Sequence, residues 1–138
     1  MRGEVRVRAT LTNAGDEMMV RRGLLTEDRV RSYEADALVD TGAVCTVLPV
    51  QVVQRLGLEI RNQRVADYAD GRKDSVGATE PIIVNINGRD TVEEALVLGD
   101  EVIIGQTVLE KLDLLVDCAS RRVIPNPAHP DQPVLKVK

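Results

Sequence analysis

The sequence predicts an all-β domain, mainly antiparallel, with one or two short helices. Residues 5–11 alternate between apolar and polar side chains, a period of two that is typical of a half-buried strand. The dipeptides Asp-Gly at 70–71 and Asn-Gly at 87–88 each stand between two strand-like runs, and both are typical of tight hairpin turns. Helical spacing of apolar residues is confined to two short stretches, 50–57 and 106–114.

The expected elements can be placed in order along the chain. Strands at 5–11 and 18–25 are joined by a turn at 13–16, and a third strand runs through 31–39. Pro49 precedes the 50–57 helix and Gly57 ends it, as is usual for these two residue types. Further strands are expected at 61–68, 73–79, 81–86, 91–98 and 102–104, and the helix at 106–114 is followed by a hairpin of 114–118 and 122–125.

Chain length favours a single domain. The 138 residues are enough to enclose one core but too few for two sizeable lobes. No internal repeat or low-complexity block divides the chain. We therefore predict one domain over residues 1–127 and a proline-rich C-terminal tail over residues 128–138.

Charge and aromatic content restrict the class of partner. The net charge is -4, and the chain has two Tyr but no Phe or Trp. Nucleic-acid surfaces usually combine basic patches with stacking rings, so a peptide or protein is the expected partner. No apolar run approaches the roughly 20 residues of a membrane helix, and the first residues are charged where a signal peptide needs an apolar core. These features predict no membrane contact and a cytoplasmic protein.

Potential metal ligands and thiols are few. Cys45, Cys118 and His129 have none of the spacings of a zinc site, so neither a metal nor another cofactor is expected. The simplest interpretation of both cysteines is that they are reduced, small core residues. The alternative is that Cys45, five residues after Asp40, lies near a functional site and makes it sensitive to oxidation.

The most informative segment is residues 37–49, which places Asp40 and Gly42 between two apolar, β-prone runs. This pattern predicts a carboxylate presented on a tight loop. Asp-Thr-Gly is by itself a weak signal, because an Asp side chain in an ordinary turn accepts backbone N–H groups in the same way. The flanking runs and the downstream pattern therefore decide its meaning.

The downstream pattern extends the motif. Asp-Thr-Gly-Ala at 40–43 follows an apolar strand, a Gly-bearing hairpin comes about 30 residues later, and Val-Ile-Ile-Gly at 102–105 leads into a short helix. In this order of parts the chain resembles the retropepsin-like aspartic proteases, and its closing segment from 109 to 127 resembles that of small bacterial and archaeal members. The resemblance implies a closed β-barrel and an aspartic-type endopeptidase. It also implies a homodimer, because a single lobe carries one catalytic aspartate.

The resemblance also assigns residues. Asp40 would be the catalytic carboxylate, and Thr41, Gly42 and Ala43 would complete its loop. The flap that closes over substrate and the segment that supports the loop would be formed by Ala69, Asp70 and Gly71, and by Ile103, Ile104 and Gly105. Gln106 and Val44-Cys45 occupy positions where viral relatives usually have an ion pair that helps to support the dimer, so that ion pair is absent here.

Two other functions are compatible with parts of this pattern. A catalytically silent dimer of the same fold could bind an extended peptide by adding strands. Loops that combine an acidic residue with glycine also occur in enzymes that bind or transfer phosphate groups. The chain, however, has no Gly-x-x-x-x-Gly-Lys loop and no alternating βα pattern. Inhibition by a mimic of the peptide-hydrolysis transition state would separate the silent dimer from the enzyme, and a nucleotide titration would test the phosphate hypothesis.

Overall fold

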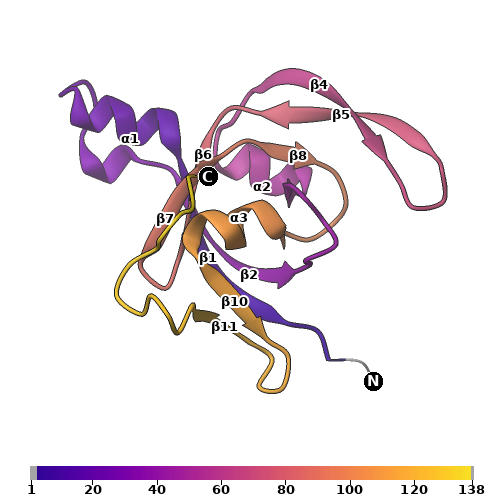
Figure 1. Ribbon diagram of the computed structural model, residues 1–138. Coiled ribbons are helices and arrows are strands. Elements are labelled where there is room, and N and C mark those ends of the chain that lie inside the picture. The colour runs from indigo at the N-terminus through magenta and orange to yellow at the C-terminus, as the bar shows by residue number, and fades with distance from the viewer. Residues whose placement is uncertain (1–2, 138) are drawn as a thin grey trace.

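Within residues 3–137, which the computed structural model describes, the chain forms one nine-stranded mixed sheet and one separate hairpin (Figure 1). The order of the large sheet is β4-β5-β8-β3-β9-β2-β1-β6-β7, and the hairpin is β10-β11. The strands are β1 (Arg6–Asn13), β2 (Ser32–Val39), β3 (Thr46–Leu48), β4 (Ile60–Asp67), β5 (Lys73–Thr79), β6 (Ile82–Ile86), β7 (Arg89–Glu93), β8 (Ala95–Val97), β9 (Ile103–Ile104), β10 (Leu114–Asp117) and β11 (Arg122–Pro125). The predicted all-β class is confirmed. Because β4 and β7 are left as edges, the sheet does not close into a barrel in the described part of the chain.

Short helices cover the sheet. They are α1 (Ala14–Arg21), α2 (Val50–Arg55) and α3 (Gln106–Leu112), with one 3-10 turn, η1 (Glu27–Arg29). The helices expected at 50–57 and 106–114 are confirmed as α2 and α3. Pro49 is the N-cap of α2, and Gly57 follows its end with a φ of 65°, which favours glycine. Among the described residues, no helix is long and apolar enough to cross a membrane.

The strand predicted at 18–25 is wrong, because this segment begins within helix α1. Asn13, expected in a turn, is the N-cap, and its side-chain oxygen accepts the N–H of Asp16 at 3.0 Å. The Asp16 carboxylate in turn accepts two hydrogen bonds from the Arg31 guanidinium, at 2.8 and 2.9 Å, which holds the pKa of Asp16 below its usual range. The two methionines that suggested a strand remain exposed. Capping, rather than burial, therefore decides the local structure.

Both predicted Gly-bearing hairpins form. Strands β6 and β7 are joined by Asn87 and Gly88, whose φ values of 54° and 83° are both positive, as a type I′ turn requires. Strands β4 and β5 pair from Ile60 to Asp67, and most of their residues are exposed. The sequence predicted one strand over 91–98, but the structure has two strands there. The first, β7, pairs with β6, whereas the second, β8, pairs with β3 and β5.

The core lies between the sheet and the helices. Strands β1 and β2 contribute inward-facing residues at alternate positions, including Ala9 opposite Ala35, which confirms the half-buried strand predicted at the start of the chain. Helices α2 and α3 add their apolar faces to the same cluster. The largest fully buried apolar side chains are Leu11, Leu48, Leu56, Ile82, Ile86, Ile104 and Leu112.

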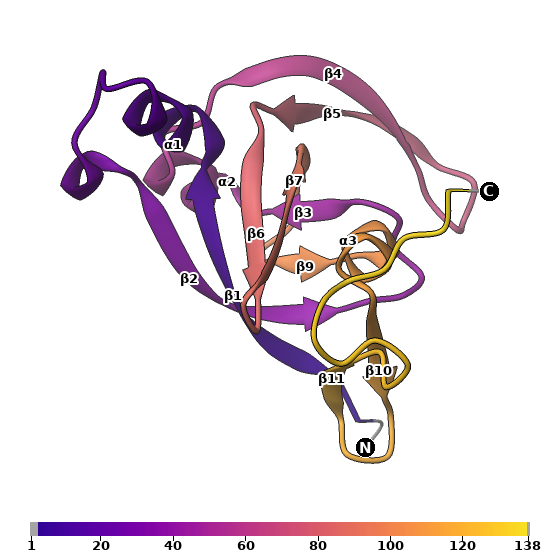
Figure 2. The same cartoon turned by 60° about the vertical axis from the view of Figure 1, so that its left-hand side comes forward.

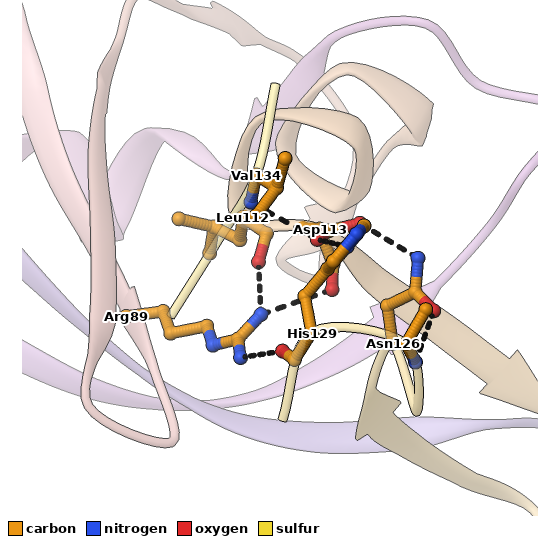
Figure 3. A network of polar contacts seen from close by, with 7 residues as sticks. Arg89, Leu112, Asp113, Asn126, His129 and Val134 are labelled. Carbon is orange, nitrogen blue, oxygen red and sulfur yellow. Dashed lines mark hydrogen bonds and ion pairs between the residues drawn. The ribbon is translucent and has the colours of Figure 1, made fainter. Parts of the chain in front are cut away.

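Arg89 connects the sheet to the C-terminal residues (Figure 3). Its side chain is buried and lies at the C-terminal end of α3, where it donates to the carbonyls of Leu112 and Asp113 at 2.9 and 3.0 Å. A further hydrogen bond of 2.7 Å goes to the carbonyl of His129. One guanidinium thus satisfies the last carbonyls of a helix and holds the following segment.

Asp113 holds the same segment from the other side (Figure 3). Its carboxylate accepts from the Asn126 side chain and from the Val134 N–H, each at 3.0 Å, and contacts the His129 ring at 2.6 Å. These contacts, led by the Asn126 hydrogen bond, lower the pKa of Asp113. The residues after β11 therefore pack against α3, and the domain boundary after residue 127 stays a prediction.

Candidate active site

Asp40 lies at the point where β2 ends, and hydrogen bonds to β9 and within its own loop hold it there. The Asp40 N–H donates to the Ile104 carbonyl at 3.0 Å, and the Ala43 N–H donates to the Asp40 carbonyl at the same distance. The side-chain oxygen Oδ1 of Asp40 accepts the Gly42 N–H at 2.9 Å. Residues 40–42 are exposed. The loop thus presents one oriented, solvent-accessible carboxylate.

The segment 103–107 lies directly against this loop. Strand β9 runs parallel to the end of β2, with Ile103 opposite Leu38. The N–H groups of Gln106 and Thr107, in the first turn of α3, donate to the carbonyls of Ala43 and Val44 at 2.8 and 3.2 Å. The helix N-terminus, whose first N–H groups have no partner within the helix, therefore finds its acceptors in the Asp40 loop.

Gly105 fits between these elements because it has no side chain. A Cβ atom at this position would lie 2.7 to 2.8 Å from the carbonyl oxygens of Ala43, Val44 and Cys45. Its φ of -95° is accessible to any residue, so space and not backbone conformation requires the glycine. The structure thus brings the predicted loop and the predicted supporting segment into close contact.

The predicted flap residues lie at the tip of the β4–β5 hairpin. In Figures 1 and 2 this hairpin extends from the sheet and curves towards the side where β2 ends. At its tip the Tyr68 N–H donates to the Arg72 carbonyl at 2.8 Å, and Gly71 has a φ of 89°. Ala69 and Asp70 complete the turn. Among residues 3–137, no hydrogen bond or ion pair joins this tip to the Asp40 loop.

Side chains stiffen the tip. The Asp70 carboxylate accepts the Arg72 N–H at 3.0 Å and the Arg72 Nε at 2.9 Å. The backbone bond is the larger cause of a lowered pKa for Asp70, and the guanidinium adds to it. The same guanidinium lies 4.6 Å from the centre of the Tyr68 ring. The carboxylate of Asp70, the guanidinium of Arg72 and the ring of Tyr68 thus hold the tip of the β4–β5 hairpin together.

The cysteines differ in part from their prediction. Both thiols are free, but Cys45 and Cys118 are exposed and neither is a core residue. They lie in a loop and in the β10–β11 turn, where apolar flanking residues do not ensure burial. Cys45 directly follows the Asp40 loop, and its sensitivity to oxidation stays a prediction. The pKa of its thiol is raised, mainly by partial desolvation. The nearby carboxylates of Glu94 and Glu93 add smaller contributions in the same direction.

An ion pair that no sequence pattern predicted lies near Cys45. Arg64 of β4 and Glu94, between β7 and β8, make a two-pronged contact with N···O distances of 3.1 to 3.4 Å. The two residues are 30 positions apart, and they meet because β5 lies between β4 and β8 in the sheet. No local pattern signals such a pair.

A separate hollow of about 540 Å³ lies between α1 and the β6–β7 hairpin. Its lining includes the apolar side chains of Met18, Ile83 and Val92, and charged residues of both signs, among them Arg21 and Glu80. None of the residues of the Asp40 loop belongs to it. The hollow therefore has no part in the chemistry of that loop.

Comparison with known proteins gives a family for most of the chain. The sequence model of the family described as gag-polyprotein putative aspartyl protease matches residues 29–111, a segment that contains the Asp40 loop, the β4–β5 hairpin and most of α3. No curated protein sequence matches the chain closely enough to serve as a relative.

Solved structures share the fold at low sequence identity. The EIAV protease complexed with the inhibitor HBY-793 is 17% identical, with a TM-score of 0.54 over 79% of this chain and 88% of that one. A retropepsin-like aspartic protease from Rickettsia conorii is also 17% identical, with a TM-score of 0.55 over 83% and 77%. The retroviral protease-like domain of Ddi1 from Leishmania major is 16% identical, with a TM-score of 0.54 over 90% and 89%.

Proposed function

Because this chain belongs to the gag-polyprotein putative aspartyl protease family, we propose that it is an aspartic endopeptidase that works as a homodimer. The observation that carries the proposal is the single exposed carboxylate of Asp40, fixed by the hydrogen bond from Gly42 and supported by segment 103–107. One chain offers one such carboxylate at this loop. Hydrolysis of a peptide bond by an aspartic protease needs two such carboxylates, so a second copy of the chain supplies the second one.

The two Asp40 carboxylates of the dimer share one proton. Two like charges about 3 Å apart do not both ionise, so one carboxylate is charged while the other is protonated. The charged member accepts a proton from water, and the water oxygen attacks the carbonyl carbon of the scissile bond. The protonated member donates to the carbonyl oxygen. The carboxyl group that took the water proton then donates it to the amide nitrogen, and the C–N bond breaks. A hydroxyl proton of the intermediate returns to the other carboxylate, so the dyad again holds one proton.

The other site residues have supporting roles in this proposal. The Thr41 hydroxyl, exposed in the single chain, reaches the partner's loop, and Gly42 places its N–H beside the carboxylate. Ala43 leaves room for substrate. The tip at Ala69, Asp70 and Gly71 closes over a bound peptide. The cytoplasmic location expected from the sequence stays a prediction.

The decisive experiment compares wild type with Asp40→Asn on a mixed peptide pool between about pH 3 and 7, a range that includes carboxylate titration. Wild type is expected to cleave, and Asp40→Asn is expected to fold but not cleave, because the amide has the shape of the carboxylate and cannot accept the water proton. Asp36→Asn is the matched control, since Asp36 is an exposed carboxylate on the same strand. Cleavage by Asp40→Asn at the wild-type rate would refute the assignment. No cleavage by wild type would favour the silent, peptide-binding dimer.

Dimerisation is tested by dilution. If each chain supplies half of the dyad, activity per mole of protein falls once the concentration drops below the dimer dissociation constant. Sedimentation or light scattering at the same concentrations reports the species present. A constant specific activity from a species shown to be monomeric would exclude the shared site.

A further inference from the structure

One face of the sheet between the Asp40 loop and the flap carries a second, small apolar group. Cross-strand partners point to the same side of a sheet, so the register determines which residues share this face. Val47 of β3 pairs with Leu96 of β8, which pairs with Ala78 of β5. Val76, two residues before Ala78, pairs with Arg64 of β4. We call these five residues, with the neighbouring Ile103 and Glu94, the inner face.

Burial distinguishes the inner face from the main core. Val47, Val76 and Ala78 are 9%, 9% and 0% exposed, yet none of them belongs to the main core cluster. Their strand neighbours Leu48 and Ala95, which point to the other side, do belong to it. Leu96 and Ile103 are only partly buried. The inner face therefore has an apolar floor of its own with open positions above it.

The inner face lies next to the candidate catalytic loop. Val47 pairs with Ile103 of β9, and β9 pairs with β2, whose end carries Asp40. Neighbouring strands are about 4.8 Å apart, so β3 is roughly 10 Å from β2. On its other side β3 leads through β8 to the two flap strands. A peptide held between Asp40 and the flap would pass over this face.

The pair of Arg64 and Glu94 forms the charged border of the inner face. Their side chains are 47% and 40% exposed, so the pair is open to solvent. An exposed ion pair contributes little net stability, and a substrate can displace one member at small cost. Glu93 lies beside it, buried and bound to Lys111.

Glu94 is the carboxylate of this border that solvent reaches, since Glu93 is buried against Lys111. At the Cys45 thiol, the carboxylates of Glu94 and Glu93 both raise the pKa more than Arg64 lowers it. A cation with an aliphatic stem fits both parts of the surface, because the stem packs on the floor while the charge reaches Glu94. An acidic side chain would instead meet the exposed Glu94 carboxylate.

We propose that the inner face is a specificity site that selects substrates with Lys or Arg within a few residues of the cut bond. The stem of that side chain lies on Val47 and Leu96, and its charge replaces Arg64 at the Glu94 carboxylate. The inference rests on the proposed protease function and adds to it a substrate class and two specificity residues.

The test is a cleavage profile of wild type on a peptide pool, with each residue type counted at each position around the cuts. Lys and Arg are expected to be enriched at one position, up to about fivefold, the size of an exposed charge interaction. Two synthetic peptides that differ only in Lys or norleucine at that position then give a kcat/KM ratio. The ratio is expected to approach one in Glu94→Gln and to rise in Arg64→Gln, where the competing guanidinium is gone.

Glu34→Gln is the matched control. Glu34 is also an exposed carboxylate in an ion pair, with Arg8 at 3.8 Å, but it lies at the far end of β2, six residues before Asp40. The kcat/KM ratio of the Lys and norleucine peptides in Glu34→Gln is expected to equal that of wild type. Unfolding curves of all variants establish that they fold.

The outcomes separate the inference from the function it rests on. Cleavage with no preference for basic residues, with enrichment of acidic ones, or with a ratio that Glu94→Gln leaves unchanged overturns the inference and leaves the protease function intact. Failure of wild type to cleave any peptide across the pH range overturns both.

Discussion

Replacement of Gly105 by alanine tests whether segment 103–107 positions the Asp40 loop. The added methyl group would lie 2.7 to 2.8 Å from three backbone oxygens, those of Ala43, Val44 and Cys45. Real Cβ atoms essentially never approach closer than 3.0 Å, and backbone atoms do not yield as a flexible side chain does. The Asp40 loop and the start of α3 must therefore move apart by roughly 0.3–0.7 Å.

The magnitude follows from the contacts that this shift disturbs. Overpacking of a close-packed site costs about 1–3 kcal/mol. Weakening of the Gln106 to Ala43 hydrogen bond, now 2.8 Å, adds about 1 kcal/mol. Gly105→Ala should thus lower the free energy of unfolding by about 2–4 kcal/mol. Since a misplacement approaching 1 Å costs about 100-fold in rate, cleavage should fall on that order.

Two assays measure these effects separately. Denaturant unfolding gives the change in free energy, and cleavage of a fixed peptide at concentrations where the variant remains folded gives the change in rate. Gly88→Ala is the matched control: its φ of 83° makes alanine unfavourable, but no heavy atom lies within 4 Å of the added Cβ. It should lose about 1 kcal/mol through backbone strain and retain its cleavage rate.

A Gly105→Ala variant whose free energy of unfolding lies within about 0.5 kcal/mol of wild type, the usual size of a neutral surface change, would refute this role of Gly105. Such a result would mean that the loop and α3 separate without cost. Loss of cleavage to the same extent in folded Gly88→Ala would show instead that the rate follows general stability and not the position of the loop.

Two further predictions concern the helix α1 and the C-terminal segment. Because the pKa of Asp16 is lowered in the folded chain, its carboxylate stabilises the fold above the ordinary carboxyl range near pH 4, and this contribution is lost as the pH falls through the lower folded value. Unfolding measured from pH 6 to 2 should therefore show a steeper loss of stability in wild type than in Asp16→Asn, and equal slopes would contradict this. Arg89→Ala should cost about 3 kcal/mol, because it leaves three carbonyls without their charged donor, and should expose residues 126–137 to limited proteolysis. Arg8→Ala, which removes an exposed guanidinium, is the control, and equal protease resistance in both variants would disprove the anchoring role.

Local sequence was sufficient wherever neighbouring residues decide the conformation. The Asn87-Gly88 hairpin follows from two residues that tolerate positive φ, and α2 from the proline and glycine at its ends. The Asp40 loop itself was also predictable, because Gly42 binds a side chain only two residues away. The strand predicted at 18–25 is wrong for a related reason: the apolar pattern was weighed without the capping side chain that precedes it.

The sequence by itself thus determined the all-β class, the family resemblance and the position of the candidate catalytic carboxylate. Only the tertiary structure decided what surrounds that carboxylate. In the sequence, Gly105 is simply a glycine after an apolar run. In the structure β9 lies beside β2, and the absence of a side chain at Gly105 leaves room for three backbone carbonyls of the Asp40 loop and the residues after it. Arg64 and Glu94 are ordinary surface charges until the order of β4, β5 and β8 brings them together. The physical reason is that register and strand order are set by burial across the whole sheet, which no local window of sequence contains.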